Sequence, residues 1–145
     1  MALPDPHPGL VVRYSYLWAD EYRAGRESGV KDRPCAVVLA RQLIEGRVIV
    51  TVAAVTHSSP TGETEAIEIP ATINRLLGLD DQQSWIIVSE VNDFLWPGPD
   101  LVPLPGSDPM RFDYGVLPPG FFRLLREKLM AVVKTQRMAR VPRTE

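Results

Sequence analysis

The sequence predicts a mainly β protein of the α+β class, a small and strongly bent β-barrel with a short middle helix and a C-terminal helix. Three observations support this prediction. Short runs rich in Val, Ile and Thr recur along the chain, turn-forming residues separate them, and the last long apolar pattern has helical spacing. A barrel suits such short strands because closing a sheet removes its exposed edges.

The N-terminal region is predicted to hold one strand and one long loop. Residues 1–8 alternate proline with other residues, so they form an extended lead-in. Residues 9–18 are predicted as the first strand. Residues 19–32 are highly charged and contain two glycines, which predicts a mobile loop that covers the site.

The middle of the chain continues with three strands and the short helix. Residues 33–42 and 46–58 are predicted as two buried strands joined by a tight antiparallel hairpin. Residues 65–70 alternate like a half-exposed strand. Residues 71–78 form a short helix ended by Gly78, because glycine readily takes the left-handed conformation that follows a helix.

The C-terminal part is predicted to hold a strand, a surface excursion and the closing helix. Residues 84–96 are predicted as one strand, and 97–113 contain five prolines without a period, which indicates an irregular surface segment. Apolar residues then recur at helical spacing over 121–133. The domain therefore spans 9–133, and 134–145 form a basic tail.

The composition indicates a single cytoplasmic domain. A chain of 145 residues, 45% of them hydrophobic, can bury one core of ordinary size. The 16 Lys and Arg against 18 Asp and Glu give a net charge of −2, so a polyanion would need a local basic surface. The single Cys35 excludes an internal disulfide and is expected to fill the core, and no apolar run suits a membrane span or secretory leader.

Five stretches follow one another in an order that is typical of one family. They are KDRPCAVVLA, VAAVTHS, EAIEIP, IIVSEVNDFLW and YGVLPPGFFRLLREKL. This order resembles the MazF/PemK-like toxins of bacterial toxin–antitoxin pairs, and the resemblance extends from Gly9 to about Val133. The chain departs from the family pattern at Leu10, where an acidic residue is usual, in its longer first loop, and in the proline-rich insertion 97–109.

The resemblance implies an SH3-like barrel and a sequence-preferring endoribonuclease, the growth-inhibiting toxin of a toxin–antitoxin pair. Such an enzyme cleaves single-stranded RNA without a metal or other cofactor, because the ribose 2′-hydroxyl attacks the adjacent phosphorus. The implied partners are RNA, a cognate acidic antitoxin and a second copy of the chain. Phe94, Leu95 and Trp96 at a strand end are expected to supply apolar surface for the homodimer.

Arg33 and Thr56 match the family's catalytic arginine and threonine, and His57 is a third catalytic candidate. A guanidinium can bind two phosphate oxygens at once, a hydroxyl can donate to the same phosphate, and imidazole suits proton transfer near neutral pH. Plainer interpretations also exist. Arg33 could be an ordinary surface cation, Thr56 could simply end a strand, and alternation points His57 to the opposite face from Thr56.

The candidate substrate-binding residues are Arg26, Lys31, Ser58, Ser59 and Glu90. Ser58 and Ser59 would equally suit an ordinary turn, and Glu90 could orient Arg33, hold a partner strand or have no role. No cluster of His, Cys and carboxylates at ligand spacing indicates a metal site. The basic tail, with cations at Lys134, Arg137, Arg140 and Arg143, is either a solvated end or an extension of the RNA track.

Two alternative functions stay open. One is a non-catalytic SH3-like barrel that binds protein or nucleic acid, and the other is a toxin that acts on topoisomerase through the C-terminal helix. The pair of Arg33 and Thr56 favours the enzyme over the binding module. The basic residues and proline after the helix argue against the topoisomerase toxin, whereas the fold alone would not separate these functions.

Overall fold

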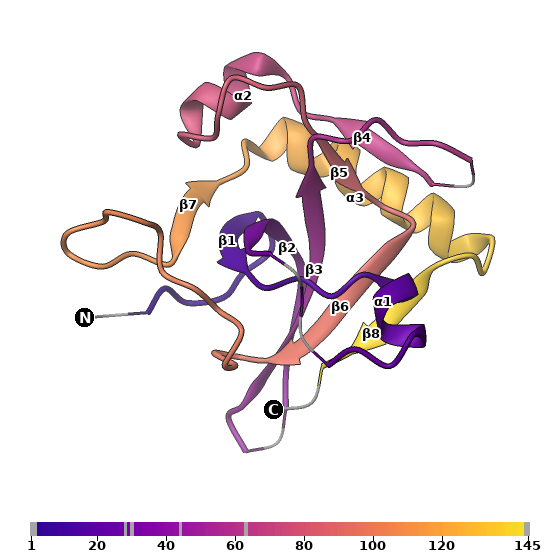
Figure 1. Ribbon diagram of the computed structural model, residues 1–145, viewed down its shortest axis with the longest axis horizontal. Coiled ribbons are helices and arrows are strands. Elements are labelled where there is room, and N and C mark those ends of the chain that lie inside the picture. Colours follow the sequence, from indigo (N-terminus) through magenta and orange to yellow (C-terminus); the bar gives the residue numbers. More distant parts are fainter. Residues whose placement is uncertain (1–2, 28, 30, 44, 63, 144–145) are drawn as a thin grey trace.

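The computed structural model of the protein describes residues 3–27, 29, 31–43, 45–62 and 64–143 (Figure 1). In chain order the elements are β1 (Leu10–Tyr14), α1 (Ala19–Arg23), β2 (Arg33–Gln42), β3 (Val48–Thr56), β4 (Ala66–Glu68), α2 (Ala71–Leu76), β5 (Trp85–Ile87), β6 (Glu90–Leu95), β7 (Asp113–Val116), α3 (Pro119–Lys134) and β8 (Ala139–Pro142). The predicted class, mainly β with a short middle helix and a C-terminal helix, is confirmed. No helix within these residues has the length and apolar character needed to cross a membrane.

The strands form one bent sheet that is organised around β3. Neighbours follow the order β4-β5-β3-β2-β1-β7, while β6 pairs with β3 and with β8. β3 pairs with β6 along its first half and with β5 at its end, and the register changes between these two partners. The ladder between β6 and β8 is parallel and the other described ladders are antiparallel.

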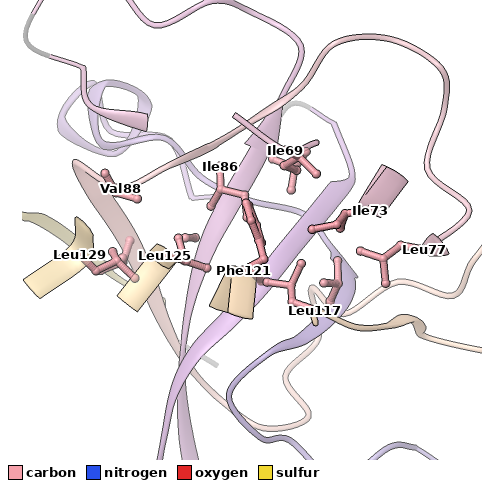
Figure 2. Close-up of a cluster of buried hydrophobic side chains, with 14 of the residues drawn as sticks. Ile69, Ile73, Leu77, Ile86, Val88, Leu117, Phe121, Leu125 and Leu129 are labelled. Carbon is pink, nitrogen blue, oxygen red and sulfur yellow. The ribbon is translucent and has the colours of Figure 1, made fainter. Parts of the chain in front are cut away.

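Both faces of the central strands are buried, which explains why the sequence of β3 does not alternate between apolar and polar residues. Val11 and Ala36 belong to one core, whereas their neighbours Val12 and Cys35 belong to a second core. α2 and α3 cover the first core. Figure 2 shows side chains from the helices, the strands and the segments beside them that meet there: Ile69, Ile73, Leu77, Ile86, Val88, Leu117, Phe121, Leu125 and Leu129.

The second core is aromatic and lies on the other face of β1–β3. The rings of Tyr14 and Phe94 stack there with centroids 4.4 Å apart. Phe94 is only 2% exposed, so the expectation that it offers dimer surface is wrong. Burial raises the pKa of the Cys35 thiol, and this cysteine acts as an apolar core residue, as the sequence predicts.

Several predicted segment bounds are wrong, and the first strand, predicted as 9–18, is β1 over Leu10–Tyr14 only. The segment 19–32 is not a loop throughout, because α1 occupies its first five residues and Ala19 packs into a small core with Leu17 and Val141. Residues 84–96 form two strands instead of one, with a break at Ser89. The break is needed because β5 and β6 pair with different parts of β3 in different registers.

The described part of the basic tail, residues 134–143, is part of the fold and not a solvated end. Residues 139–142 form β8 beside β6, and each nearby arginine is paired with a carboxylate. Arg137 contacts Glu65 at 2.6 Å, Arg140 contacts Asp93 at 2.8 Å, and Arg143 contacts Asp100 at 2.7 Å. Such short pairs use the cationic donors that an RNA track would need.

Replacing Leu125 by Ala is expected to lower the free energy of unfolding by about 2–5 kcal/mol, because Leu125 is fully buried in the first core and truncation leaves a cavity. The matched control is Leu124→Ala on the same helix. Leu124 is 56% exposed, so its truncation should change stability by less than about 0.5 kcal/mol. Urea unfolding of both variants measures the difference, and equal losses would mean that α3 packs through another face.

Candidate functional site

The start of β2 and the end of β3 lie side by side and bring Arg33 and Thr56 together. The register that pairs Cys35 with Ala54 sets Arg33 opposite Thr56 two residues further along. The Arg33 guanidinium lies over the Trp18 ring, 5.0 Å from its centroid, and Nη1 donates to the carbonyl of Val55 at 3.4 Å. Its Nε is buried without a hydrogen-bond partner within the described residues, so the stacking contact and one backbone acceptor hold the group.

Thr56 combines the two roles that its sequence position allows. Its Oγ1 accepts a hydrogen bond from the amide of Ser58 at 3.1 Å, which is the turn contact expected at a strand end. A hydroxyl that accepts one hydrogen bond still has its own proton to donate. The turn therefore fixes the side chain and leaves the O–H available to a ligand.

Arg33 and Thr56 stand at the boundary between two cavities and contribute to both. The first has a volume of about 570 Å³. Several Arg and Lys side chains line it, and it is called here the cationic cavity. The second, of about 360 Å³, contains Ser58, Ser59, Thr61 and Thr64 and is called here the hydroxyl cavity. A ligand longer than one cavity would pass directly over the Arg33–Thr56 pair.

The cationic cavity carries an excess of positive charge. Its lining includes four permanent cations, Arg13, Lys31, Arg33 and Arg111, against the two carboxylates of Asp32 and Asp80. The whole chain has a net charge of −2, so this concentration is local. Such a cavity attracts anions that the molecule as a whole would repel.

His57 also lines the cationic cavity, beside Thr56. Its Nδ1 lies 3.1 Å from the carbonyl oxygen of Gln83, and its Nε2 lies 2.8 Å from Oδ2 of Asp80. Both partners are acceptors, so the ring satisfies both only when each nitrogen carries a proton. His57 is near the site, and in this arrangement both of its ring nitrogens are engaged by other residues.

Most of the predicted binding residues reach the two cavities. Lys31 lines the cationic cavity, and Ser58, Ser59 and Glu90 line the hydroxyl cavity. Arg26 does not line either of these two cavities, so its role in the site stays a prediction. Arg26 lies three residues after Arg23, the last residue of α1, and its amide donates to the carbonyl of Glu21, which turns the chain at that point.

Glu90 holds the segment before α1 and acts on the position of Arg33 indirectly. Its carboxylate accepts hydrogen bonds from the Ala19 amide at 3.1 Å and the Tyr16 hydroxyl at 3.3 Å. Burial raises the pKa of Glu90, and these two donors offset part of the effect. Trp18 lies between Tyr16 and Ala19 in the sequence. By holding both of these residues, Glu90 helps to fix the Trp18 ring on which Arg33 stacks.

Among the residues of the cationic cavity that sequence reasoning missed are Arg13, Arg111 and Tyr114. Arg13 is the one charged residue in the otherwise apolar strand β1, and this exception was the signal that could have indicated a site residue. In the ladder Arg13 pairs with Pro34, which is next to Arg33 in sequence. Tyr114 lies near Arg13, which offsets part of the rise that burial causes in the tyrosine pKa. Arg111 comes from the proline-rich segment, where no pattern in the sequence marks it.

Neither a family model nor a curated protein nor a solved structure matches this chain. The resemblance to MazF/PemK-like toxins therefore stays a prediction based on sequence motifs. Within the described part of the chain, no three His, Cys, Asp or Glu side chains are grouped as a metal site requires. The chemistry of the site has to be inferred from Arg33, Thr56 and the two cavities.

Replacing Glu90 by Gln is expected to stabilise the protein at neutral pH but not in acid. Gln keeps an acceptor for the Ala19 amide and removes the charge that burial penalises. Because the pKa of Glu90 is raised in the folded state, the wild type loses stability as pH rises through that value. Below the ordinary value of 4.5 the carboxyl is protonated in both states, and the advantage of Glu90→Gln disappears.

Thermal midpoints of the wild type and of Glu90→Gln across this pH range measure the effect. A midpoint difference that does not change with pH would contradict the assignment of the burial penalty to Glu90.

Proposed function

We propose that the protein is a metal-independent, sequence-preferring endoribonuclease that cleaves single-stranded RNA, and that it acts as the toxin of a toxin–antitoxin pair in the cytoplasm. The observation that carries the proposal is that Arg33 and Thr56 both line each of the two neighbouring cavities. A strand of RNA that fills both cavities would have one phosphate at this pair.

Arg33 supplies the positive charge that the reaction needs. The ribose 2′-oxygen attacks phosphorus and forms a P–O2′ bond, the P–O5′ bond breaks, and negative charge builds on the non-bridging oxygens. A guanidinium stabilises that charge best when it is already positioned, because no reorganisation is then required. The stacking on Trp18 and the contact with Val55 provide this positioning while Nη2 keeps its donors.

Thr56 supplies a neutral donor beside the guanidinium. Its hydroxyl is oriented by the Ser58 amide, so the O–H can donate to a phosphoryl oxygen with little loss of side-chain freedom. The proton that leaves the 2′-hydroxyl and the proton that the 5′-oxygen receives must be carried by other groups. His57 lines the same cavity and is a candidate for donating to the 5′-oxygen, after its exposed bond to Asp80 opens.

The alternative is a non-catalytic barrel that binds single-stranded nucleic acid. The observation that favours it is the engagement of both ring nitrogens of His57 with Gln83 and Asp80. A barrel of this kind would use Arg33 and Thr56 to hold a phosphate without cleaving the chain.

The proposed partners are those of a toxin. An acidic antitoxin segment would bind at the cationic cavity and compete with RNA for Arg33. A homodimer would extend the RNA-binding surface across two copies. Large apolar side chains that are exposed on β2, β7 and α3, among them Leu39, Val116 and Met130, are available to such an interface.

Arg33→Lys is expected to lower the rate of RNA cleavage in the presence of chelator by about 10²–10³, because lysine keeps the charge but loses the planar fork. Thr56→Val should lower it by about 2–10-fold, the effect of one neutral hydrogen bond, and Thr56→Ser should restore most of the rate. Single-turnover cleavage of a mixed-sequence RNA measures all three. RNA with a 2′-deoxy sugar at the cut position should stay intact, because the nucleophile is absent.

Arg41→Lys is the matched control, since Arg41 is exposed at the far end of β2. This variant should cleave RNA at the wild-type rate. Thermal midpoints of Arg33→Lys and wild type should agree within a few degrees. Wild-type cleavage by both Arg33→Lys and Thr56→Val would rule out the enzyme, and tight RNA binding without any cleavage by the wild type would establish the binding module.

The proposed homodimer predicts a molar mass in light scattering that is twice the mass of one chain at micromolar concentration. Association should persist in high salt, because apolar contacts are not screened. A monomer at every accessible concentration would contradict a binding surface shared between two copies.

A further inference from the structure

The cationic cavity is walled on one side by the proline-rich segment that follows β6. Leu104, Pro105 and Arg111 line the cavity from this segment. The loop after α2, through Leu77, Leu79 and Asp80, lines it from another element. The segment 97–113, which the sequence predicts only as an irregular surface segment, therefore forms part of the wall of the cavity that Arg33 also lines.

The proline-rich wall is tied to the sheet at several points. Leu101 bridges to Tyr14, and the Val102 amide donates to the Arg13 carbonyl at 2.9 Å. The Leu104 amide donates to the Arg111 carbonyl at 2.7 Å, which closes the loop on itself. These contacts mean that the cavity is built before any ligand arrives.

The cationic side chains of this cavity make only long contacts, or none, with carboxylates of the protein. Arg13 lies 3.8 Å from Asp32 and Arg111 lies 3.7 Å from Asp113, and both distances exceed a hydrogen bond. Lys31 has no ion pair among the described residues. In contrast, the arginines near β8 contact their carboxylates at 2.6–2.8 Å. Arg111 and Lys31 therefore keep donors for a ligand in this cavity, whereas the arginines near β8 are held by their carboxylates.

The same cavity has apolar walls and one aromatic hydroxyl. Leu79, Leu104 and Pro105 offer apolar surface, and the Tyr114 side chain lies near Arg13. A bare inorganic anion would use the cations but not these walls. A nucleotide has both an anionic part and a flat, largely apolar part, and about 570 Å³ is within the range of small-ligand sites.

We propose that the cationic cavity binds one nucleotide of the RNA substrate next to the cleaved bond, with its phosphate at Arg111, Lys31 and Arg13 and its base against Leu104 and Pro105. This proposal rests on the proposed function for the identity of the strand. It makes the proline-rich insertion a determinant of sequence preference, because the insertion supplies the wall that contacts the base.

The test uses a short 2′-O-methyl oligoribonucleotide, which cannot be cleaved, and follows its binding to the full chain by fluorescence anisotropy. Arg111→Gln should weaken binding about tenfold and reduce the slope of log affinity against log salt by about 0.7, the value for one phosphate contact on a single strand. Arg111 is 57% exposed, so this change should leave folding intact. The matched control is Arg126→Gln on the exposed side of α3, which removes one charge away from the cavity and should leave the slope unchanged.

The base wall is tested by competition and by a second pair of variants. Nucleoside 5′-monophosphates should displace the oligoribonucleotide at a concentration at least about tenfold lower than inorganic phosphate does. Leu104→Ala should reduce this advantage, whereas Leu124→Ala, the same change on α3, should not. Equal displacement by phosphate and by nucleotides would overturn the proposal, because the cavity would then recognise charge alone.

Failure of the proposal can be distinguished from failure of the enzyme. If RNA is cleaved but Arg111→Gln binds like Arg126→Gln, the nucleotide site is wrong and the endoribonuclease stands. If the oligoribonucleotide binds through Arg111 and RNA is never cleaved, the nucleotide site stands and the protein is the binding module.

Discussion

The antiparallel pairing of β2 with β3 is the constraint on which the rest of the structure depends. Its register pairs Cys35 with Ala54, which directs Arg33 and Thr56 to the same end of the two strands. The ladder also has two faces, and each is covered by a core. One face is covered by α2 and α3, and the other is filled by aromatic rings such as Phe94. A hairpin buried on both sides cannot shift its register without moving apolar side chains between two cores, so the geometry at its open end is rigid.

The position of Arg33 also depends on contacts far from β2. Trp18 supports the guanidinium, and the residue before Trp18 is held by Asn92, whose amide bonds to both the N–H and the carbonyl of Leu17 at 2.9 and 2.8 Å. Arg143 reinforces the same place, with bonds to the Ser15 carbonyl at 2.8 Å and to Asn92 at 3.1 Å. A buried polar network of this kind specifies one arrangement because each unsatisfied member would be costly. The candidate site is therefore supported by residues from both ends of the chain.

Sequence reasoning recovered what local pattern determines and failed where distant contacts decide. The bounds of β2 were predicted to the residue, because a local turn and a continuous apolar run define that strand. The break at Ser89 was missed because no proline or glycine marks it, and only the change of register along β3 requires it. The four residues of β8 are too few for a period to be recognised, and they become a strand only because β6 offers an open edge. Arg33 and Thr56 were found from family motifs, whereas Arg111 is brought to the same cavity by the tertiary fold alone.

The parallel addition of β8 to β6 has a consequence for the order in which the molecule assembles during translation. Arg143 contacts Ser15 across 128 positions of sequence, so that bond can form only when almost all of the described chain has been synthesised. Contacts of such long range form late, because the closure of a large loop must precede them. The ribosome delivers Trp18, Arg33 and Thr56 early, yet their final support arrives with the last strand. Maturation of the candidate site is thus delayed until synthesis of the domain is complete.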